Sequence, residues 1–310
     1  MSKQPRVKQA VFFFLIMLCL TPFVNAPIAL LLGFAMVNTI GNPYPVESNK
    51  AVKWLLKAAI IGLGFGMNFY SAVKAGKDGL IFTVATIILV LACGWLIGKL
   101  LKLDFKTTYL VSSGTAICGG SAIAAVAPII QAEPKQISVA LGTVFILNAI
   151  ALLIFPSIGH YFELSQYQFG IWSAVAIHDT SSVVGAAAAY GAEALETATV
   201  IKLGRALWII PLSVITVFFY RKNSNKILIP YFILFFIFAM LISTFFPAGQ
   251  PLYEVIVLIA KKALVVTLFL IGSGLSFAII KSTGLKTLFL GVLLWLIISA
   301  TSLFAIISLY

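Results

Sequence analysis

The chain alternates long apolar runs with short polar or turn segments. The apolar runs lie near residues 10–22, 27–41, 53–73, 79–100, 107–130, 136–156, 167–190, 198–220, 227–246, 254–280 and 286–309. A helix of about 20 apolar residues spans a bilayer, and most of these runs reach that length, although the first two are short enough to form one tight hairpin. The pattern therefore predicts an all-α polytopic membrane protein with about 11 transmembrane helices.

One run is interrupted by small and hydroxylic residues at positions 112–128. In hydrocarbon an unpaired backbone N–H or C=O group costs several kcal/mol, so glycine and proline are tolerated only where protein or a polar cavity satisfies the backbone. We therefore expect a discontinuous helix that lines a substrate path, with a half-helix end that favours an anion. The candidate substrate-binding residues in this segment are Gly114, Thr115, Cys118, Gly119, Gly120 and Ser121.

A second polar cluster lies in the middle of the run at 167–190. Ionisable groups inside a membrane normally face a cavity or a partner, and they mark substrate or proton pathways. With helical spacing, His178 would share a face with Ser181 and Ser182. A histidine beside a carboxylate can titrate near neutral pH, which suits proton coupling; the alternative is a polar pair that locks helix packing. The expected ion-coupling residues are His178, Asp179, Thr180, Ser181 and Ser182.

Two cations begin the next apolar run. Lys202 and Arg205 are three residues apart and therefore share one helical face. They either snorkel to the membrane interface, neutralise Asp179, or present positive charge to an anionic substrate. Arginine suits the last role because its planar guanidinium group can bind an oxyanion through two hydrogen bonds, and on that reading both residues join the substrate-binding set.

The chain also repeats itself weakly. The sequence GFGMNF at residues 64–69 resembles GSGLSF at residues 272–277, which is 208 positions later. Counting apolar runs places these two segments in opposite directions across the membrane. A fainter echo at an offset of 60 matches Ala-Ile at residues 116–117 with Ala-Ile at residues 176–177, and those two spans run the same way. Either echo can arise by chance in a chain rich in Gly, Ala and Ser.

The number of runs predicts a larger repeat inside one transmembrane transporter domain. After an extra N-terminal helix at residues 1–26, we expect a first repeat at residues 27–158 and a second at residues 165–310. Each repeat holds five spans, so the second is inverted, as in many secondary transporters. The interrupted run at 107–130 then pairs with the run at 254–280. This pairing adds Gly272, Ser273 and Gly274 to the substrate-binding set.

Composition and charge agree with a membrane protein. The chain is 61% hydrophobic and 10% charged, and its net charge is +12. We expect no nucleic-acid partner, because the basic residues cluster in short loops as the positive-inside rule describes. They predict a cytoplasmic N-terminus and an external C-terminus. The orienting clusters are Lys3, Arg6 and Lys8; Lys99, Lys102 and Lys106; Arg221, Lys222 and Lys226; and Lys281 with Lys286.

The motifs do not indicate an enzyme. The sequence has no Walker loop, no zinc-ligand spacing and no Gly-x-Ser-x-Gly elbow. Its three cysteines, Cys19, Cys93 and Cys118, lack the paired spacing of a zinc site or a disulfide framework. We therefore expect no catalytic residue, no metal site and no cofactor beyond a coupling H⁺ or Na⁺.

The two polar motifs, Ser113–Ala125 and Ala176–Val184, closely resemble the YeiH-type sulfate exporter family of bacterial inner-membrane proteins. The similarity extends over almost the whole chain, including Lys202 with Arg205 and the segment at 272–276. The resemblance implies a fold related to the bile acid:sodium symporter and cation/proton antiporter group, with crossed discontinuous helices. It also implies export of sulfate or a related organosulfonate.

Together these observations predict a secondary active transporter that moves a small anion by alternating access, with ion coupling. A sodium-coupled organic anion symporter is the nearest alternative, with Asp179, Thr180 and Ser181 as oxygen ligands. An anion channel or a membrane sensor is the alternative from a different class. The expected partners are the anionic substrate and the lipid bilayer, and homo-oligomerisation stays open.

Overall fold

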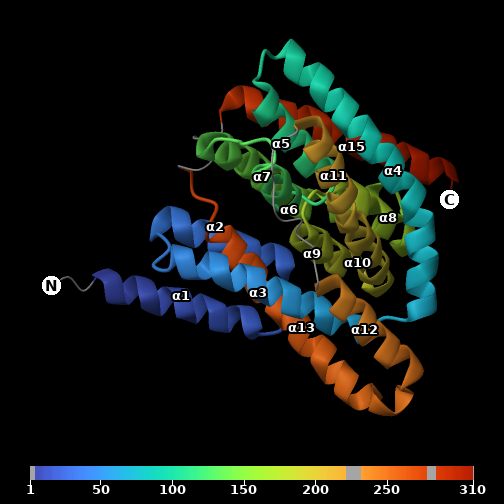
Figure 1. Ribbon diagram of the computed structural model, residues 1–310. Coiled ribbons are helices and arrows are strands. Elements are labelled where there is room, and N and C mark those ends of the chain that lie inside the picture. The colour runs from blue at the N-terminus through green and yellow to red at the C-terminus, as the bar shows by residue number, and fades with distance from the viewer. Residues whose placement is uncertain (1–3, 221–231, 278–283, 310) are drawn as a thin grey trace. The chain divides into compact units, whose positions relative to one another are not determined.

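The computed structural model describes residues 4–220, 232–277 and 284–309, and every regular element in these ranges is a helix (Figure 1). Five described segments are long and apolar enough to cross a membrane: Phe82–Leu100, Lys135–Tyr161, Ala192–Tyr220, Pro247–Gly272 and Leu285–Leu309. Shorter apolar helices cover Val7–Leu20, Pro27–Thr39 and Phe232–Phe245. The predicted all-α polytopic membrane fold is confirmed, and the total of about 11 spans stays a prediction. Of the orienting residues, Lys3, Arg221, Lys222, Lys226 and Lys281 lie outside the described residues.

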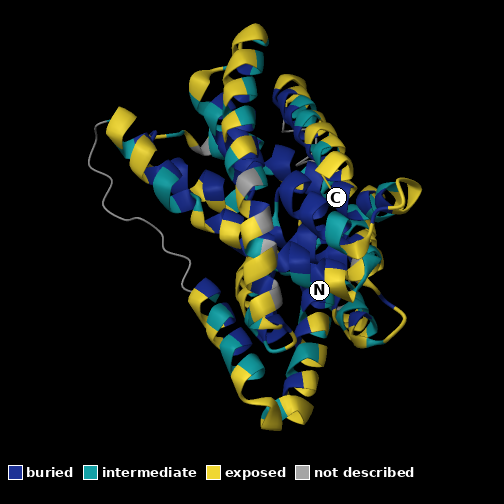
Figure 2. Ribbon diagram, turned by 90° about the vertical axis from the view of Figure 1, so that its right-hand side faces the viewer, coloured by how far each residue is buried: buried dark blue, intermediate teal, exposed yellow. Residues whose placement is uncertain are grey.

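Large apolar side chains lie on the outer faces of the helices. Phe218 and Phe304 are each 76% exposed, and Trp95 is 57% exposed. Figure 2 shows such exposed positions alternating with buried ones along the same helices. Contiguous exposed apolar surface marks contact with a membrane or a partner, and lipid tails solvate these side chains as well as a protein core does.

The helices group into two compact units, the first of which combines residues 1–73 with residues 231–277. Its elements are α1 (Gln4–Leu20), α2 (Ala26–Thr39), α3 (Pro45–Gly64), α12 (Phe232–Phe245), η1 (Pro247–Gly249) and α13 (Gln250–Gly272). In this unit α13 packs against α1, α2 and α3, and α12 packs against α3. The long apolar helix α13 is therefore its centre.

Two glycines allow α2 and α13 to touch through their backbones. A Cβ atom at Gly33 would lie 2.1 Å from the carbonyl oxygen of Phe269, and one at Gly272 would lie 2.1 Å from that of Leu30. No side chain fits at such distances. Small residues at helix crossings are how membrane helices gain contact area without a hydrophobic drive.

The second unit combines residues 74–230 with residues 278–310. Its elements are α4 (Phe69–Leu100, which begins in the first unit), α5 (Phe105–Ala116), α6 (Gly120–Val126), α7 (Pro134–Tyr161), α8 (Gln166–Ala176), α9 (Thr180–Tyr190), α10 (Ala192–Leu207), α11 (Ile209–Tyr220) and α15 (Leu285–Leu309). Helix α7 packs against α5, α6 and α9, while α10 packs against α8 and α9. The predicted repeats at 27–158 and 165–310 do not follow these units and stay a prediction.

Helix caps in the sequence explain where two of these elements begin. The carboxylate of Asp104 accepts the N–H of Thr107 at 2.9 Å and so starts α5. Ser165 and Gln168 form a reciprocal capping box at the start of α8. Such caps satisfy N–H groups that have no partner inside the helix.

The sequence echo at an offset of 208 corresponds to equal local structure in the first unit. Helix α3 ends at Gly64 and α13 ends at Gly272. After α3, the N–H of Gly66 donates to the carbonyl of Leu63 at 3.0 Å. After α13, the N–H of Gly274 donates to the carbonyl of Ile271, also at 3.0 Å. The matched glycines therefore end two helices in the same way.

Candidate functional site

The first break lies between α5 and α6. Helix α5 ends at Ala116, and the following Gly119 has a φ of 64°, a conformation that favours glycine. A Cβ atom at Gly114 would lie only 2.9 Å from Cδ1 of Ile123 in α6. Residues nine positions apart in a straight helix are separated by about 13.5 Å, so α6 turns back against α5. The interruption predicted within residues 112–128 is confirmed.

The second break lies between α8 and α9. Helix α8 ends at Ala176 and α9 begins at Thr180, with Asp179 as its N-cap. The Asp179 carboxylate accepts the N–H of Ser181 at 3.1 Å and also its hydroxyl group. The helical spacing expected between His178 and the serines is therefore wrong, because the carboxylate satisfies the N-terminal N–H groups and a new helix starts after it.

Asn148 of α7 holds the backbone of the second break. Its Oδ1 accepts the N–H groups of His178 and Asp179, both at 3.1 Å. Both N–H groups would be unpaired without it, which is costly inside a membrane. The site predicted from the sequence did not include Asn148. The feature that could have identified it is a polar amide in the middle of an apolar run.

The two breaks meet inside the second unit. A Cβ atom at Gly119 would lie 3.5 Å from both Cα and Cβ of Asp179, and 3.1 Å from Cγ1 of Val144 in α7. The structure thus brings the first break against the polar cluster 60 positions later. The expected pairing with the run at 254–280 stays a prediction. Gly272 of that run lies in the other unit, where its backbone packs against Leu30.

Lys202 of α10 caps the carbonyl end of α8. Its Nζ donates to the carbonyl oxygens of Ala174 at 3.2 Å and Ile177 at 2.6 Å. The side chain is 0% exposed, so it does not snorkel to the interface. A cation at a helix C-terminus compensates the negative end of the helix dipole.

Arg205, one turn later on α10, caps the carbonyl end of α5. It donates to the carbonyl oxygens of Ala116 at 2.5 Å and Ile117 at 3.3 Å, and to Oγ1 of Thr86 in α4 at 2.8 Å. It is 1% exposed. The hydrogen bonds of the two cations go to helix ends and to α4, and neither cation donates a hydrogen bond to Asp179, which was one of the three alternatives.

Arg205 leaves a net positive charge at the first break, whereas the Asp179 carboxylate offsets Lys202 at the second break. A helix C-terminus carries the equivalent of about half a negative charge, whereas each cation contributes a full positive one. Both charges are buried, where electrostatic effects are screened less than at a surface. The arrangement therefore favours an anion near the first break.

Unpartnered polar atoms lie on the same segments. Among the described residues, buried side-chain atoms without a hydrogen-bond partner include the hydroxyls of Ser113 and Thr115, Nδ2 of Asn148 and both ring nitrogens of His178. Buried polar groups are normally paired. These atoms are therefore candidate contacts for the polar atoms of a ligand, and Ser113 joins Asn148 among the residues that the predicted site lacked.

The remaining predicted residues differ in exposure. Cys118, Thr180, Ser181, Ser182 and Ser273 are buried, Gly120 is half-buried, and Ser121 and Gly274 are exposed. In the first unit, Ser273 receives a hydrogen bond from Asn42 at 3.0 Å and donates one to the carbonyl of Leu270 at 2.7 Å. Its hydroxyl group is therefore engaged within that unit.

Comparison with known proteins identifies the family. Residues 11–291 match the family described as Conserved hypothetical protein 698. The chain belongs to this family. Similar proteins include UPF0324 membrane proteins of Bacteroides thetaiotaomicron, 53% identical over 283 residues (91% of this chain and 86% of the relative), and of Vibrio parahaemolyticus, 54% identical over 293 residues (93% and 94%). No solved structure matches the chain. In this member of the Conserved hypothetical protein 698 family, the match covers both helix breaks and α10.

Proposed function

We propose that this membrane protein is a secondary active transporter that moves a small anion, sulfate or a related sulfur oxyanion or organosulfonate, by alternating access. The contact between the breaks at Gly119 and Asp179 carries the proposal. Interrupted helices expose backbone groups within the membrane, and secondary transporters bind their substrates at such points. The resemblance to YeiH-type sulfate exporters supplies the sulfur oxyanion class and the relation to bile acid:sodium symporters.

The anion preference rests on the two buried cations. Arg205 keeps the surroundings of the first break positive even after it compensates the helix dipole, and Lys202 offsets the Asp179 carboxylate at the second break. In this proposal the anion contacts the N–H groups at the start of α6, at residues 120 and 121, and the hydroxyls of Ser113 and Thr115. The two cations act through their charge and by holding the helix ends, since their N–H groups already bond carbonyl oxygens.

We assign the coupling ion to His178 and Asp179 and propose that it is a proton. The half-buried Asp179 carboxylate beside the Ser181 hydroxyl is the feature that favours sodium instead. Sodium in transporters is also coordinated by the carbonyl ends of half-helices. At α8 those carbonyls already bond the ammonium group of Lys202, which favours a proton.

Flux measurements on purified protein in liposomes test the proposal. We expect saturable uptake of radiolabelled sulfate or taurine driven by a pH gradient, with counterflow of labelled substrate. Asp179→Asn should abolish uptake, and His178→Gln should change its pH dependence. Glu193→Gln is the control, because Glu193 is exposed at the start of α10.

Each alternative has its own result. Uptake that requires a sodium gradient at constant pH supports the sodium-coupled symporter. Flux without saturation or counterflow supports a channel. The absence of anion flux under either gradient contradicts the transport proposal.

The location and orientation are part of the same proposal. We place the protein in the bacterial inner membrane with its N-terminus in the cytoplasm and its C-terminus outside. The test introduces single cysteines at Lys102 or Glu193 in a variant without native cysteines. If this orientation holds, an impermeant reagent added outside labels the cysteine at position 193 and not the one at position 102. Equal labelling of both positions from one side contradicts it.

A further inference from the structure

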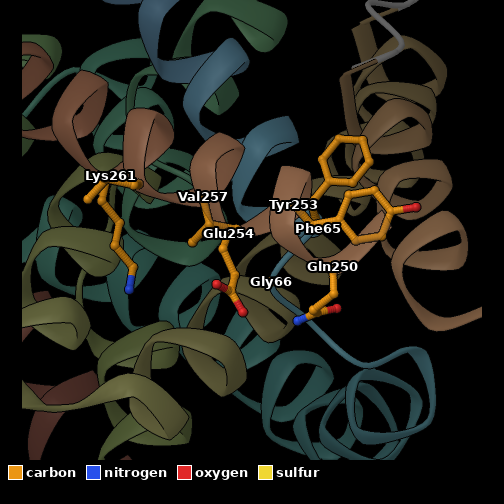
Figure 3. Close-up of a pocket in the computed structure, with 8 residues that line it drawn as sticks. Phe65, Gly66, Gln250, Tyr253, Glu254, Val257 and Lys261 are labelled. Atoms are coloured by element: carbon orange, nitrogen blue, oxygen red, sulfur yellow. The ribbon is translucent and has the colours of Figure 1, made fainter. Parts of the chain in front are cut away.

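A groove in the first unit lies apart from the helix breaks. It has a volume of about 370 Å³ and is lined by residues of α13 and of the turn after α3. Figure 3 shows the side chains of Gln250, Glu254 and Lys261 extending from the same side of α13. Cavities of roughly 300–1,000 Å³ are the size that binds small molecules.

The groove places two opposite charges on a membrane helix. Lys261 lies in the middle of the apolar segment Pro247–Gly272, and Glu254 lies about 10 Å nearer its start, at a rise of about 1.5 Å per residue. Both side chains are exposed, and within the described ranges neither is hydrogen bonded or ion paired. Charged groups at this depth in a membrane normally have a partner.

The walls of the groove complete the site. The rings of Phe65 and Tyr253 stack at one end with centroids 5.3 Å apart, and an aromatic face attracts a cationic group. Gly66 forms another part of the wall, because a Cβ atom there would lie 2.9 Å from Cγ2 of Val257. A larger residue at position 66 would fill the space beside Val257.

We propose that this groove binds a zwitterion, with its ammonium group at Glu254 and the aromatic rings and its oxyanion at Lys261. A simple anion would leave the Glu254 carboxylate without a partner, and a simple cation would leave Lys261 without one. An unpaired charge within the apolar span of a membrane helix is costly. One zwitterion satisfies both groups and adds no net charge.

The same chemistry occurs in a free amino acid or aminosulfonate and in the headgroup of phosphatidylethanolamine. The site does not depend on the proposed transport function, since its residues belong to the first unit and the helix breaks to the second. Binding is therefore measured without flux, and a failed flux assay leaves this test intact.

The test uses the full chain in phosphatidylglycerol nanodiscs, because phosphatidylcholine is itself a zwitterion. Taurine should bind, measured by calorimetry and by a rise in the melting temperature, whereas ethanesulfonate and ethylamine should bind at least about tenfold more weakly, because each lacks one charge-assisted contact. For the lipid source, native mass spectrometry should show phosphatidylethanolamine retained in preference to phosphatidylglycerol, which lacks the ammonium group. Binding of either zwitterion supports the proposal and identifies the source.

Charge variants make the result specific to the groove. Glu254→Gln and Lys261→Gln should each weaken zwitterion binding by roughly tenfold to a hundredfold, and the exchange of Glu254→Lys with Lys261→Glu should restore part of it. Lys262→Gln is the matched control, because Lys262 lies outside the groove and bonds the carbonyl of Thr21. Zwitterion binding that is unchanged in both single variants, or absent from the wild type, overturns the proposal.

Discussion

Lys202 and Arg205 stand one turn apart on α10, and each bonds the carbonyl end of a different broken helix. Residues three positions apart on a helix share a face, so one turn of α10 holds both breaks. Both side chains are buried among helices of the second unit. The two cations therefore contribute first to the stability of the site, and the charge of Arg205 then favours an anion at the first break.

Removal of the Arg205 guanidinium should destabilise the protein strongly. Arg205→Ala leaves the carbonyls of Ala116 and Ile117 without this donor, and each orphaned buried acceptor costs about 1–3 kcal/mol. We expect a clearly lower melting temperature in detergent, with partial recovery in Arg205→Lys. Gly204→Ala is the control, since a Cβ there meets nothing within 4 Å and should be neutral or stabilising. Equal melting temperatures for the two alanine variants would contradict the capping role.

Loss of the Lys202 ammonium should make stability depend on sodium. In Lys202→Ala the carbonyls of Ala174 and Ile177 lose their donor, and such helix ends coordinate Na⁺ in transporters. A cation that binds the folded state raises the melting temperature. We expect a higher melting temperature in sodium chloride than in choline chloride for the variant and no difference for the wild type. If Lys202→Ala has the same melting temperature in both salts, sodium does not take the place of the Lys202 ammonium group.

Asn148 should be replaceable only by a residue that still accepts hydrogen bonds. Asn148→Leu leaves the N–H groups of His178 and Asp179 unpaired, at a cost of about 1–3 kcal/mol for each. Asn148→Asp keeps the acceptor and should retain more stability. The melting temperatures of the two variants are compared by thermal unfolding. A higher melting temperature for Asn148→Leu than for Asn148→Asp would show that the break does not need this acceptor.

Two adjacent glycines should respond differently to alanine. Gly119→Ala forces a side chain into a positive φ conformation and places its Cβ 3.1 Å from Val144; a residue in such a region costs about 1–3 kcal/mol. At Gly120 the nearest contact is the end of the flexible Leu141 side chain at 3.3 Å, without a positive φ. We expect Gly119→Ala to lower both the melting temperature and the flux, and Gly120→Ala to affect stability little. Equal loss of stability in both would mean that the backbone at 119 is not special.

The position of the first break was predictable because glycine and hydroxylic residues have a local meaning in a membrane helix. The second break was not, since a carboxylate inside an apolar run is compatible with a continuous helix. Only the contacts of Asp179 with Ser181 and of its N–H with Asn148 show that the helix stops there. The faint echo at an offset of 60 joined the equivalent residues of both breaks, although a match of Ala-Ile is too common to show that by itself.

The sequence alone determined the membrane class, the all-α fold and the presence of polar groups inside apolar helices, because hydropathy and helix-breaking residues act locally. It did not identify the contact between the breaks at Gly119 and Asp179, and it left open whether Lys202 and Arg205 face lipid, substrate or protein. Those answers depend on residues far apart in the chain. The tertiary structure decided them by placing the turn of α10 at the carbonyl ends of α5 and α8, where buried backbone groups require a donor.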